Sequence, residues 1–466
     1  MLIRFNVRNF LSFASRADGG AEEFSMIPGK VRIHKDHLYD DNNLKLLKFA
    51  AIYGANASGK SNLIKAIDFA KKTIIRGLPE GASDKYCKSK NENKNSKSYF
   101  EFEIKITDKI YAYGFEVILS MGRFTSEWLV ELKDRDTEIS VFERDIENNT
   151  FEIGAQLNED ELRNKINVYL DDIRSDDSVL FLSIMNQNKK DLYKQYPSAN
   201  VMRDVFNWIN DQLDVNYPYR PISDYSYMAN AQNVKKISKI ISAFGTGIEN
   251  FNFTEVPLQK VLSKLPIFVR RRILNQLDRE LMELNKNNNN NNNNKQKKIG
   301  MVLRSDREFF LITPNKDLNN EYKCKTIQFL HHNIESLFSI EEESDGTVRL
   351  LDLLVILLDG DNKTYVVDEL DRCLHPCLTY KFIQTFLEEA AKKNIQLIVT
   401  THESRLMDFN LLRRDEIWFV DKNKNGETNI YSLDEYNERF DKKIDKAYLD
   451  GRYGGVPIFT TVFPVE

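Results

Sequence analysis

The strongest constraint on the fold is a run of eight residues, Gly54-Ala-Asn-Ala-Ser-Gly-Lys-Ser61. An apolar segment from about Leu47 to Tyr53 precedes it, and apolar residues at helical spacing follow it as far as Gly77. This pattern predicts a strand, a tight turn and a helix in succession. The glycines of such a turn let backbone N–H groups converge on a phosphate at the positive end of the helix dipole. The sequence therefore predicts a phosphate-binding loop in an α/β fold.

A second segment supplies the acidic part of such a site. Tyr365-Val-Val-Asp-Glu369 is an apolar strand that ends in two carboxylates. We expect Lys60 to reach the β- and γ-phosphates, and Ser61 and Asp368 to hold Mg²⁺. Glu369 is expected to orient or polarise an attacking water. Two acidic residues at a strand end usually mark only the point where the strand meets solvent, but the phosphate loop favours the catalytic interpretation.

Changes in periodicity divide the chain into four predicted segments. Segment 1–94 contains an opening strand and the phosphate loop, and segment 95–158 alternates apolar and polar residues as an antiparallel meander does. Segment 159–300 has helical spacing and ends in the tract Asn287 to Asn294, which we interpret as a solvated linker. Segment 301–466 returns to apolar strands separated by helices, which indicates a parallel sheet covered on both faces.

The composition limits the partners of the chain. Its 66 Lys and Arg and 70 Asp and Glu residues leave a net charge of −4, so it has no global attraction to nucleic acid. The hydrophobic fraction of 41% excludes wholesale disorder. Four cysteines do not make a disulfide framework, and no apolar run approaches the ~20 residues that span a bilayer. We therefore expect a cytoplasmic protein without a membrane partner.

Further motifs resemble those of a known superfamily. Glu343-Ser-Asp-Gly-Thr347, Asp368-Glu-Leu-Asp371 and Thr401-His402 resemble the signature, the Walker B plus D-loop, and the switch histidine of ABC-type ATPases. With the phosphate loop, Leu374-His-Pro376 and Gly451-Arg-Tyr-Gly-Gly-Val-Pro457, they are similar to the AAA-type, ABC-like ATPases of bacteria and archaea. That group is related to the OLD, RecF and SMC heads and supplies ATPase subunits to anti-phage systems such as PARIS, Septu and certain retrons. The resemblance covers residues 1–76 and 301–466.

The resemblance implies an α/β P-loop NTPase with an ABC-type head, built from a mixed or parallel sheet, an antiparallel meander and an inserted helical lobe. It assigns Mg²⁺-dependent ATP hydrolysis to Lys60, Glu369 and His402, and the metal to Ser61 and Asp368. The residues that it places around ATP are Gly54, Ala55, Asn56, Ala57, Ser58, Gly59, Lys60, Ser61, Asn62, Ser344, Gly346 and Asp371. In ABC-type enzymes the signature caps the nucleotide of another protomer, so a homodimer or higher oligomer is implied.

Three functions compete on this evidence. The favoured one is the sensor or scaffold ATPase of an anti-phage system that acts with a separate effector, either a nuclease or a toxin. The alternative is a RecF- or SMC-like DNA-repair ATPase, which leaves nucleic acid open as a partner. The long interval between Ser61 and Ser344 argues against a transporter subunit, in which these motifs lie much closer.

Three other patterns have plainer interpretations. Cys373-Leu-His-Pro-Cys377 offers three metal ligands, but Pro376 disturbs helical presentation and the stretch lies within the D-loop segment. His331-His332 is interpreted as packing or surface. Arg270-Arg-Arg272 is interpreted as an exposed helix face rather than a phosphate-binding patch.

Overall fold

The chain folds into two compact units. In the computed structural model, the described residues are 1–41, 43–134, 137–157, 159–174, 176–219, 231–288, 301–305, 308–314, 322–358, 362–436 and 444–456. The first unit comprises Met1–Asn216, Gly360–Leu370 and Ile383–Glu466, and the second comprises Tyr217–Asp359 and Asp371–Phe382. Residues 289–294 of the asparagine tract and Pro457 of the glycine-rich motif lie outside the described residues.

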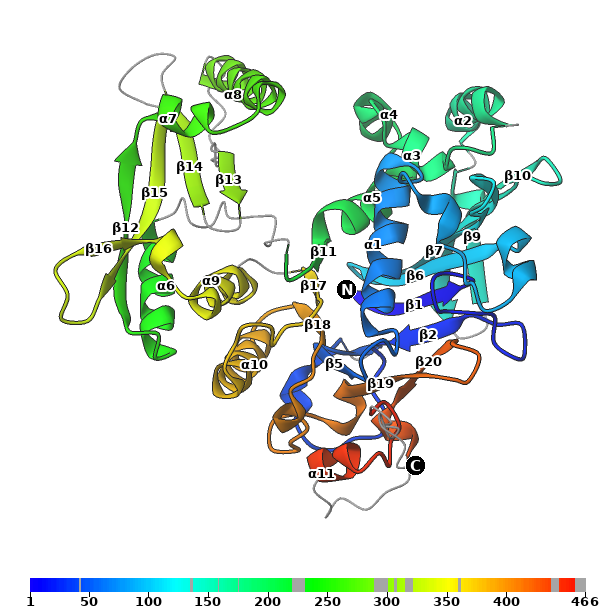
Figure 1. Ribbon diagram of the computed structural model, residues 1–466. Coiled ribbons are helices and arrows are strands. Elements are labelled where there is room, and N and C mark those ends of the chain that lie inside the picture. The colour runs from blue at the N-terminus through cyan, green and yellow to red at the C-terminus, as the bar shows by residue number, and fades with distance from the viewer. Residues whose placement is uncertain are drawn as a thin grey trace. The chain divides into compact units, whose positions relative to one another are not determined.

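An antiparallel sheet of seven strands forms one part of the first unit (Figure 1), in the order β10-β9-β8-β7-β6-β1-β2. Its strands are β1 (Leu2–Arg8), β2 (Glu22–Ser25), β6 (Ser98–Ile106), β7 (Lys109–Ile118), β8 (Arg123–Asp134), β9 (Thr137–Asp145) and β10 (Thr150–Ile153). Strands β6 to β10 pair in chain order, which confirms the predicted meander. Phe100, Phe102 and Ile104 are buried because alternate side chains of a strand share one face.

A second sheet in this unit has the order β11-β17-β18-β5-β19-β20. Its strands are β5 (Phe49–Tyr53), β11 (Leu213–Asn216), β17 (Thr364–Val367), β18 (Gln396–Thr400), β19 (Ile417–Lys422) and β20 (Thr428–Ser432). The first five are parallel, and β20 is an antiparallel edge strand. Strands β5, β17 and β18 are buried along their whole length, as parallel strands covered on both faces are. The predicted parallel sheet is therefore confirmed.

Helix α1 (Lys60–Arg76) begins directly after the phosphate loop and ends before Gly77, as predicted. It packs on the antiparallel sheet through Phe69, whose ring centroid lies 4.8 Å from that of Phe10 and 5.3 Å from that of Phe100. The first unit also contains β3 (Leu38–Asp40), β4 (Lys45–Leu47), α11 (Ile444–Leu449) and, from Ile383 onwards, α10 (Pro376–Ala390). Helix α1 thus ties the loop to a large aromatic core.

The second unit has its own antiparallel sheet, in the order β12-β15-β14-β13 with β16 paired to β15. The strands are β12 (Ile248–Val256), β13 (Met301–Ser305), β14 (Glu308–Pro314), β15 (Tyr322–His331) and β16 (Leu337–Ser339), and the helices are α6 (Ala231–Ala243), α7 (Leu258–Ser263), α8 (Ile267–Asn288) and α9 (Asp345–Leu358). Val261 and Leu277 from α7 and α8 pack against Ile312 and Cys324 of the sheet. This small core holds the unit together.

The segment predicted to be helical also contains strands. Its helices α2 (Asp160–Ile173), α3 (Phe181–Met185), α4 (Lys190–Gln195), α5 (Asn200–Asn207), α6, α7 and α8 agree with the prediction. The apolar residues Val201, Val205, Ile209 and Leu213 have helical spacing, but α5 ends at Asn207, and the chain passes through a short π-helical turn into β11. Strand β11 is too short to show alternation, and the alternating Phe251 and Phe253 of β12 lie between two helical patterns.

None of the described helices is both long and apolar enough to cross a membrane.

Candidate functional site

The loop between β5 and α1 has the shape that its glycines predict. Gly59 is the N-cap residue of α1, with φ of 119° and no side-chain cap. A Cβ atom on Gly59 would lie 2.4 Å from Thr428 Oγ1, and one on Gly54 would lie 2.4 Å from the carbonyl oxygen of Val420. No larger residue fits at either position. Because the first N–H groups of a helix have no partner in a preceding turn, the start of α1 presents them to a ligand.

Two side chains complete this cradle. Lys60 is only 6% exposed, and its Nζ donates hydrogen bonds to the carbonyl oxygens of Gly54 (2.7 Å) and Ala55 (3.0 Å). The buried Oγ of Ser58 has no hydrogen-bond partner among the described residues. A buried hydroxyl without a partner is costly, so an oxygen-rich ligand would relieve it. Uncapped N–H groups, an ammonium group and a spare hydroxyl are the chemistry that a triphosphate requires.

The predicted metal-binding residues converge from two elements. Asp368 directly follows β17, and its Oδ1 accepts hydrogen bonds from Thr400 Oγ1 (2.6 Å) and from Ser61 Oγ (3.1 Å). Ser61 belongs to the first turn of α1. A hydroxyl and a carboxylate oxygen at this separation form a donor set that suits a small hard cation. The pair therefore fits Mg²⁺.

Glu369 lies at the same edge of the sheet, in a strained backbone conformation. Its φ is 47°, which a residue with a side chain rarely adopts. Its N–H donates to Thr400 Oγ1 at 2.8 Å, and the next N–H, that of Leu370, donates to the Thr400 carbonyl at 3.0 Å. These two bonds hold the strained turn in place. Such strain is often found at functional positions.

His402 follows β18, whose neighbours in the sheet are β17 and β5. The side chain of His402 is exposed, and the N–H of the preceding Thr401 donates to the Ile52 carbonyl at 3.1 Å. Because the carboxyl ends of parallel strands meet at one edge, the three strands place the phosphate loop, both carboxylates and this histidine along the same edge. The first unit therefore holds every predicted catalytic residue.

The signature residues belong to the second unit. Ser344 precedes α9, and its Oγ accepts a hydrogen bond from Thr347 N at 3.1 Å, so it caps the helix. A Cβ atom on Gly346 would lie 2.7 Å from the carbonyl oxygen of Cys373. The signature therefore packs closely on the D-loop segment that follows Asp371. Cys373, His375 and Cys377 of that segment do not gather as a ligand group among the described residues.

A comparison with protein families decides the identity of the chain. The family described as "AAA domain, putative AbiEii toxin, Type IV TA system" matches residues 49–178 and 150–408, which together make up most of the chain. The chain belongs to this AAA domain family. The predicted resemblance to AAA-type, ABC-like ATPases is thus confirmed.

Three SMC heads are among the similar solved structures. The SmcHead bound to the C-winged helix domain of ScpA is 16% identical, with 92% of this chain and 97% of that chain covered and a TM-score of 0.41. The SMC head domain from Thermotoga maritima is 13% identical, with 92% and 98% covered and a TM-score of 0.34. An Smc head with an extended coiled coil, bound to the C-terminal domain of ScpA and derived from Pyrococcus furiosus, is 14% identical, with 97% and 98% covered and a TM-score of 0.39. These likenesses are too distant to carry a functional argument. No curated protein matches the sequence.

The C-terminal glycine-rich motif, which lies outside the residues matched by the AAA domain family, packs against the phosphate loop. A Cβ atom on Gly455 would lie 3.2 Å from the Cα of Gly54. The hydroxyl of Tyr448 donates to the Gly455 carbonyl at 3.1 Å, and burial raises the pKa of Tyr448. The ring centroids of Tyr53 and Tyr448 are 5.9 Å apart. The motif is therefore packed against the first residue of the loop, a role that its sequence alone does not reveal.

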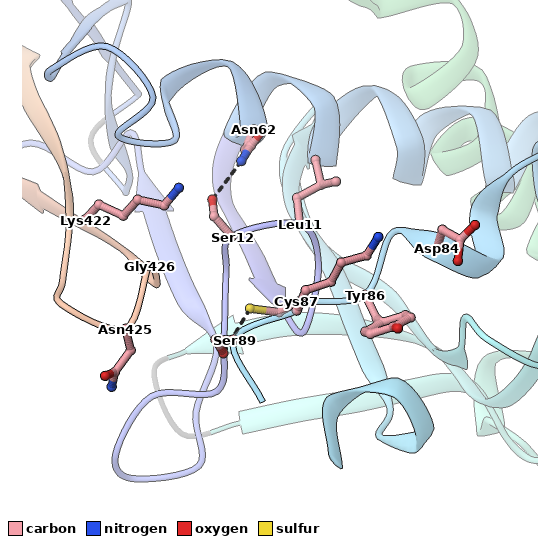
Figure 2. Close-up of a pocket in the computed structure, with 11 residues that line it drawn as sticks. Leu11, Ser12, Asn62, Asp84, Tyr86, Cys87, Ser89, Lys422, Asn425 and Gly426 are labelled. Atoms are coloured by element: carbon pink, nitrogen blue, oxygen red, sulfur yellow. Dashed lines mark hydrogen bonds between the residues drawn. The ribbon is translucent and has the colours of Figure 1, made fainter. Parts of the chain in front are cut away.

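Sequence reasoning missed a pocket of about 410 Å³ beside the start of α1, which Figure 2 shows. Asn62, Ser12, Tyr86 and Lys422 line it, and Asn62 Nδ2 donates to Ser12 Oγ at 2.8 Å. These residues come from separate parts of the chain, so no motif unites them. Only the position of Asn62, directly after Ser61, pointed to this region.

Tyr86 belongs to the polar segment 83–98 that follows α1, and the side chain of Asn9 anchors this segment. Asn9 Nδ2 donates to the carbonyl oxygens of Asn93 (2.8 Å) and Ser96 (3.0 Å), and its Oδ1 accepts from Cys87 N (3.1 Å). Asn9 is itself only 2% exposed. The stretch is thus pinned to the end of β1, and the pocket has a size typical of small-molecule sites.

Proposed function

We propose that this protein binds ATP with Mg²⁺ at the phosphate loop of the first unit and hydrolyses it. The observation that carries the proposal is the convergence of Ser61 and Asp368 beside Lys60 and Glu369. Lys60 and the N–H groups of the loop bind the phosphate oxygens, and the cation held by Ser61 and Asp368 neutralises their charge. The pocket beside Asn62 accommodates the nucleoside end of the same molecule.

Within this site, Glu369 accepts a proton from the attacking water, and His402 contacts the γ-phosphate. The strained turn supports the role of Glu369, because the hydrogen bonds of Thr400 keep its backbone in one conformation. The position of His402 after β18, the strand between β17 and β5, supports the role of the histidine.

We further propose that Ser344, Gly346 and Asp371 act on the nucleotide of a second copy of the chain. The start of α9 is a second helix N-terminus, and such ends attract anions. Gly346 leaves room for the close approach of the D-loop segment, so the signature and Asp371 form one surface of the second unit. The functional species is then a homodimer or a higher oligomer.

The biological role that we propose is that of the ATPase subunit in a prokaryotic defence system, which acts as sensor or scaffold for a separate effector. The family description supports this role, since it names a toxin of a type IV toxin–antitoxin system. For the alternative, a DNA-repair ATPase, we find no comparable support, and the net charge of −4 does not favour it.

Glu369→Gln tests the enzymatic proposal. The amide keeps the shape of the side chain but cannot accept the proton, so ATP binding should persist while turnover falls roughly 10²–10⁴-fold. Glu388→Gln is the matched control, because Glu388 is an exposed residue of α10. Nucleotide binding is measured by calorimetry and hydrolysis by phosphate release. Undiminished hydrolysis by Glu369→Gln would overturn the assignment.

The defence role is tested by phage plating on cells that carry the gene with its genomic neighbours. We expect protection with the wild-type protein and with Glu388→Gln, and loss of protection with Glu369→Gln. Equal plating with and without the genes, together with ATP hydrolysis that duplex DNA stimulates, would instead favour the repair alternative.

A further inference from the structure

Outside the nucleotide site, three side chains with metal-binding chemistry gather immediately before β3. His34, Asp36 and His37 each offer a ligand atom, and these atoms lie within 4.8 Å of one another. Among the residues that the structure describes, no other group of three such side chains is this close. His37 is buried, His34 is half-buried and Asp36 is exposed. The group belongs to the first unit and takes no part in the proposed ATPase site.

The hydrogen bonds of the two histidines leave one nitrogen of each ring available. His34 Nε2 lies 2.8 Å from the carbonyl oxygen of Phe409. That oxygen can only accept, so Nε2 carries the proton and Nδ1 keeps its lone pair. His37 Nδ1 lies 3.0 and 3.1 Å from the two carboxylate oxygens of Glu416, so it donates and Nε2 keeps its lone pair. A carbonyl or carboxylate behind the ring is the usual arrangement around metal-binding histidines.

The supporting groups are themselves buried and held. Glu416 is fully buried and also accepts a hydrogen bond from the backbone N–H of Arg413 at 2.7 Å. The guanidinium of Arg413 pairs with Asp415 at 2.6 Å and donates to the Ile33 carbonyl at 2.8 Å. These bonds attach residues 33–37 to residues 409–416, which lead into β19. The groups that would orient the two histidine ligands of a metal ion are therefore already in place.

The backbone and rings of the group carry a second sign of constraint. His34 has φ of 47° and ψ of 55°, a left-handed conformation that is uncommon for residues other than glycine. The two imidazole rings are stacked, with centroids 4.8 Å apart and planes inclined by 15°. Strained backbone of this kind persists where the surroundings demand it, which is often at a binding site.

We propose that His34, Asp36 and His37 bind a divalent transition metal of the Zn²⁺ class. Imidazole nitrogen suits Zn²⁺ and its neighbours in the transition series, whereas Mg²⁺ and Ca²⁺ prefer oxygen ligands alone. The ligand atoms now lie within 4.8 Å of one another, and metal–ligand bonds of ~2.0–2.2 Å require them to move somewhat closer together. The Asp36 side chain is exposed, so it can rotate towards the two histidines. The ion would fix residues 34–37 in one conformation, and the two histidines already hydrogen-bond to the segment that precedes β19.

Zinc titration of the full chain tests this proposal. The protein is purified without a polyhistidine tag, stripped with a chelator and titrated with Zn²⁺ by calorimetry, while its melting temperature is followed. We expect one Zn²⁺ per chain and a rise in melting temperature with Zn²⁺ concentration. Asp36→Asn and His34→Gln should each weaken binding at least ~10-fold, since even the loss of a supporting residue has that effect. The matched control is His332→Gln, because the His332 side chain is 75% exposed and belongs to the second unit.

X-ray absorption on the zinc-loaded wild-type protein gives a readout that depends on no variant. Two imidazoles with oxygen and no sulfur would support the proposed ligands. Sulfur in the spectrum would assign the ion to cysteine ligands elsewhere in the chain and would overturn the proposal. Absence of Zn²⁺ binding by the wild type, or equal affinity in the wild type, Asp36→Asn and His34→Gln, would overturn it as well. None of these outcomes depends on ATP hydrolysis, so the result is independent of the proposed function.

Discussion

The N-termini of α1 and α9 both present backbone N–H groups, but they differ in how these groups are capped. Both are candidate anion-binding ends, but α1 begins at Gly59, which has no side chain to cap it, whereas α9 is capped by the hydroxyl of Ser344. The α1 end has the cationic Lys60 and the unpaired hydroxyl of Ser58 beside it. From this difference we expect the first end to bind phosphate without help from a second helix end. At the second end the Ser344 hydroxyl already occupies one N–H group, so we expect this end to contribute only when a nucleotide held elsewhere is brought to it.

The largest expected effect is that of Lys60→Ala on ATP binding. Hydrogen bonds to charged groups contribute about 1.5–3 kcal/mol, so affinity should fall roughly 10- to 150-fold, and hydrolysis should be lost. Lys65→Ala is the matched control on the same helix, where Lys65 is exposed. Calorimetric titration with a non-hydrolysable ATP analogue measures both. Equal binding of the analogue by the two variants would show that the start of α1 does not bind phosphate by itself.

Mixing two inactive proteins tests whether the α9 end serves a second copy. One carries Lys60→Ala and the other Ser344→Arg, whose bulky side chain blocks the start of α9. With random exchange, half of the dimers are mixed, and each has one intact site of two, so about a quarter of wild-type hydrolysis should return. Full hydrolysis by strictly monomeric wild-type protein, without an ATP-dependent dimer, would contradict the shared site.

Gly59→Ala should damage the loop more than its conformation alone explains. The residue has positive φ, and its new Cβ would lie 2.4 Å from Thr428 Oγ1. Gly77→Ala is a matched control, because Gly77 also has positive φ but no atom within 4 Å of a Cβ. We expect about 1–3 kcal/mol of destabilisation for Gly77→Ala, and a further ~1–3 kcal/mol with impaired ATP binding for Gly59→Ala. Chemical denaturation measures the difference; equal losses would show that the close approach to Thr428 is unimportant.

The smallest effect concerns the cap of α9. Ser344→Ala removes the acceptor for Thr347 N and should cost about 1 kcal/mol, whereas Ser344→Asn keeps a capping oxygen and should cost little. If Ser344 also contacts nucleotide in the dimer, Asn restores stability without restoring hydrolysis. If Ser344→Asn had wild-type stability and wild-type hydrolysis, Ser344 would act only as a helix cap. Melting curves and phosphate release on the same samples distinguish the two results.

Part of this protein could be predicted because the relevant signals are local in the sequence. The phosphate loop, Asp368 and Glu369 each lie where an apolar strand ends, and a strand of four or five residues suffices to reveal that position. The meander and the parallel sheet were predicted for the same reason, since alternation and unbroken apolar runs are read within a few residues. The segment boundaries at 94, 158 and 300 and the catalytic roles of the site residues stay predictions.

The sequence by itself determined most of the elements and their order, and it predicted which residues surround the phosphates. Tertiary structure alone decided which distant segments support them. Gly455 packs on Gly54, the pocket beside Asn62 unites segments from both ends of the chain, and His37 lies on Glu416. The physical reason is that periodicity records which face of an element is buried, but not which remote residue covers it. A contact across several hundred residues leaves no local pattern, so it becomes visible only when the chain is folded.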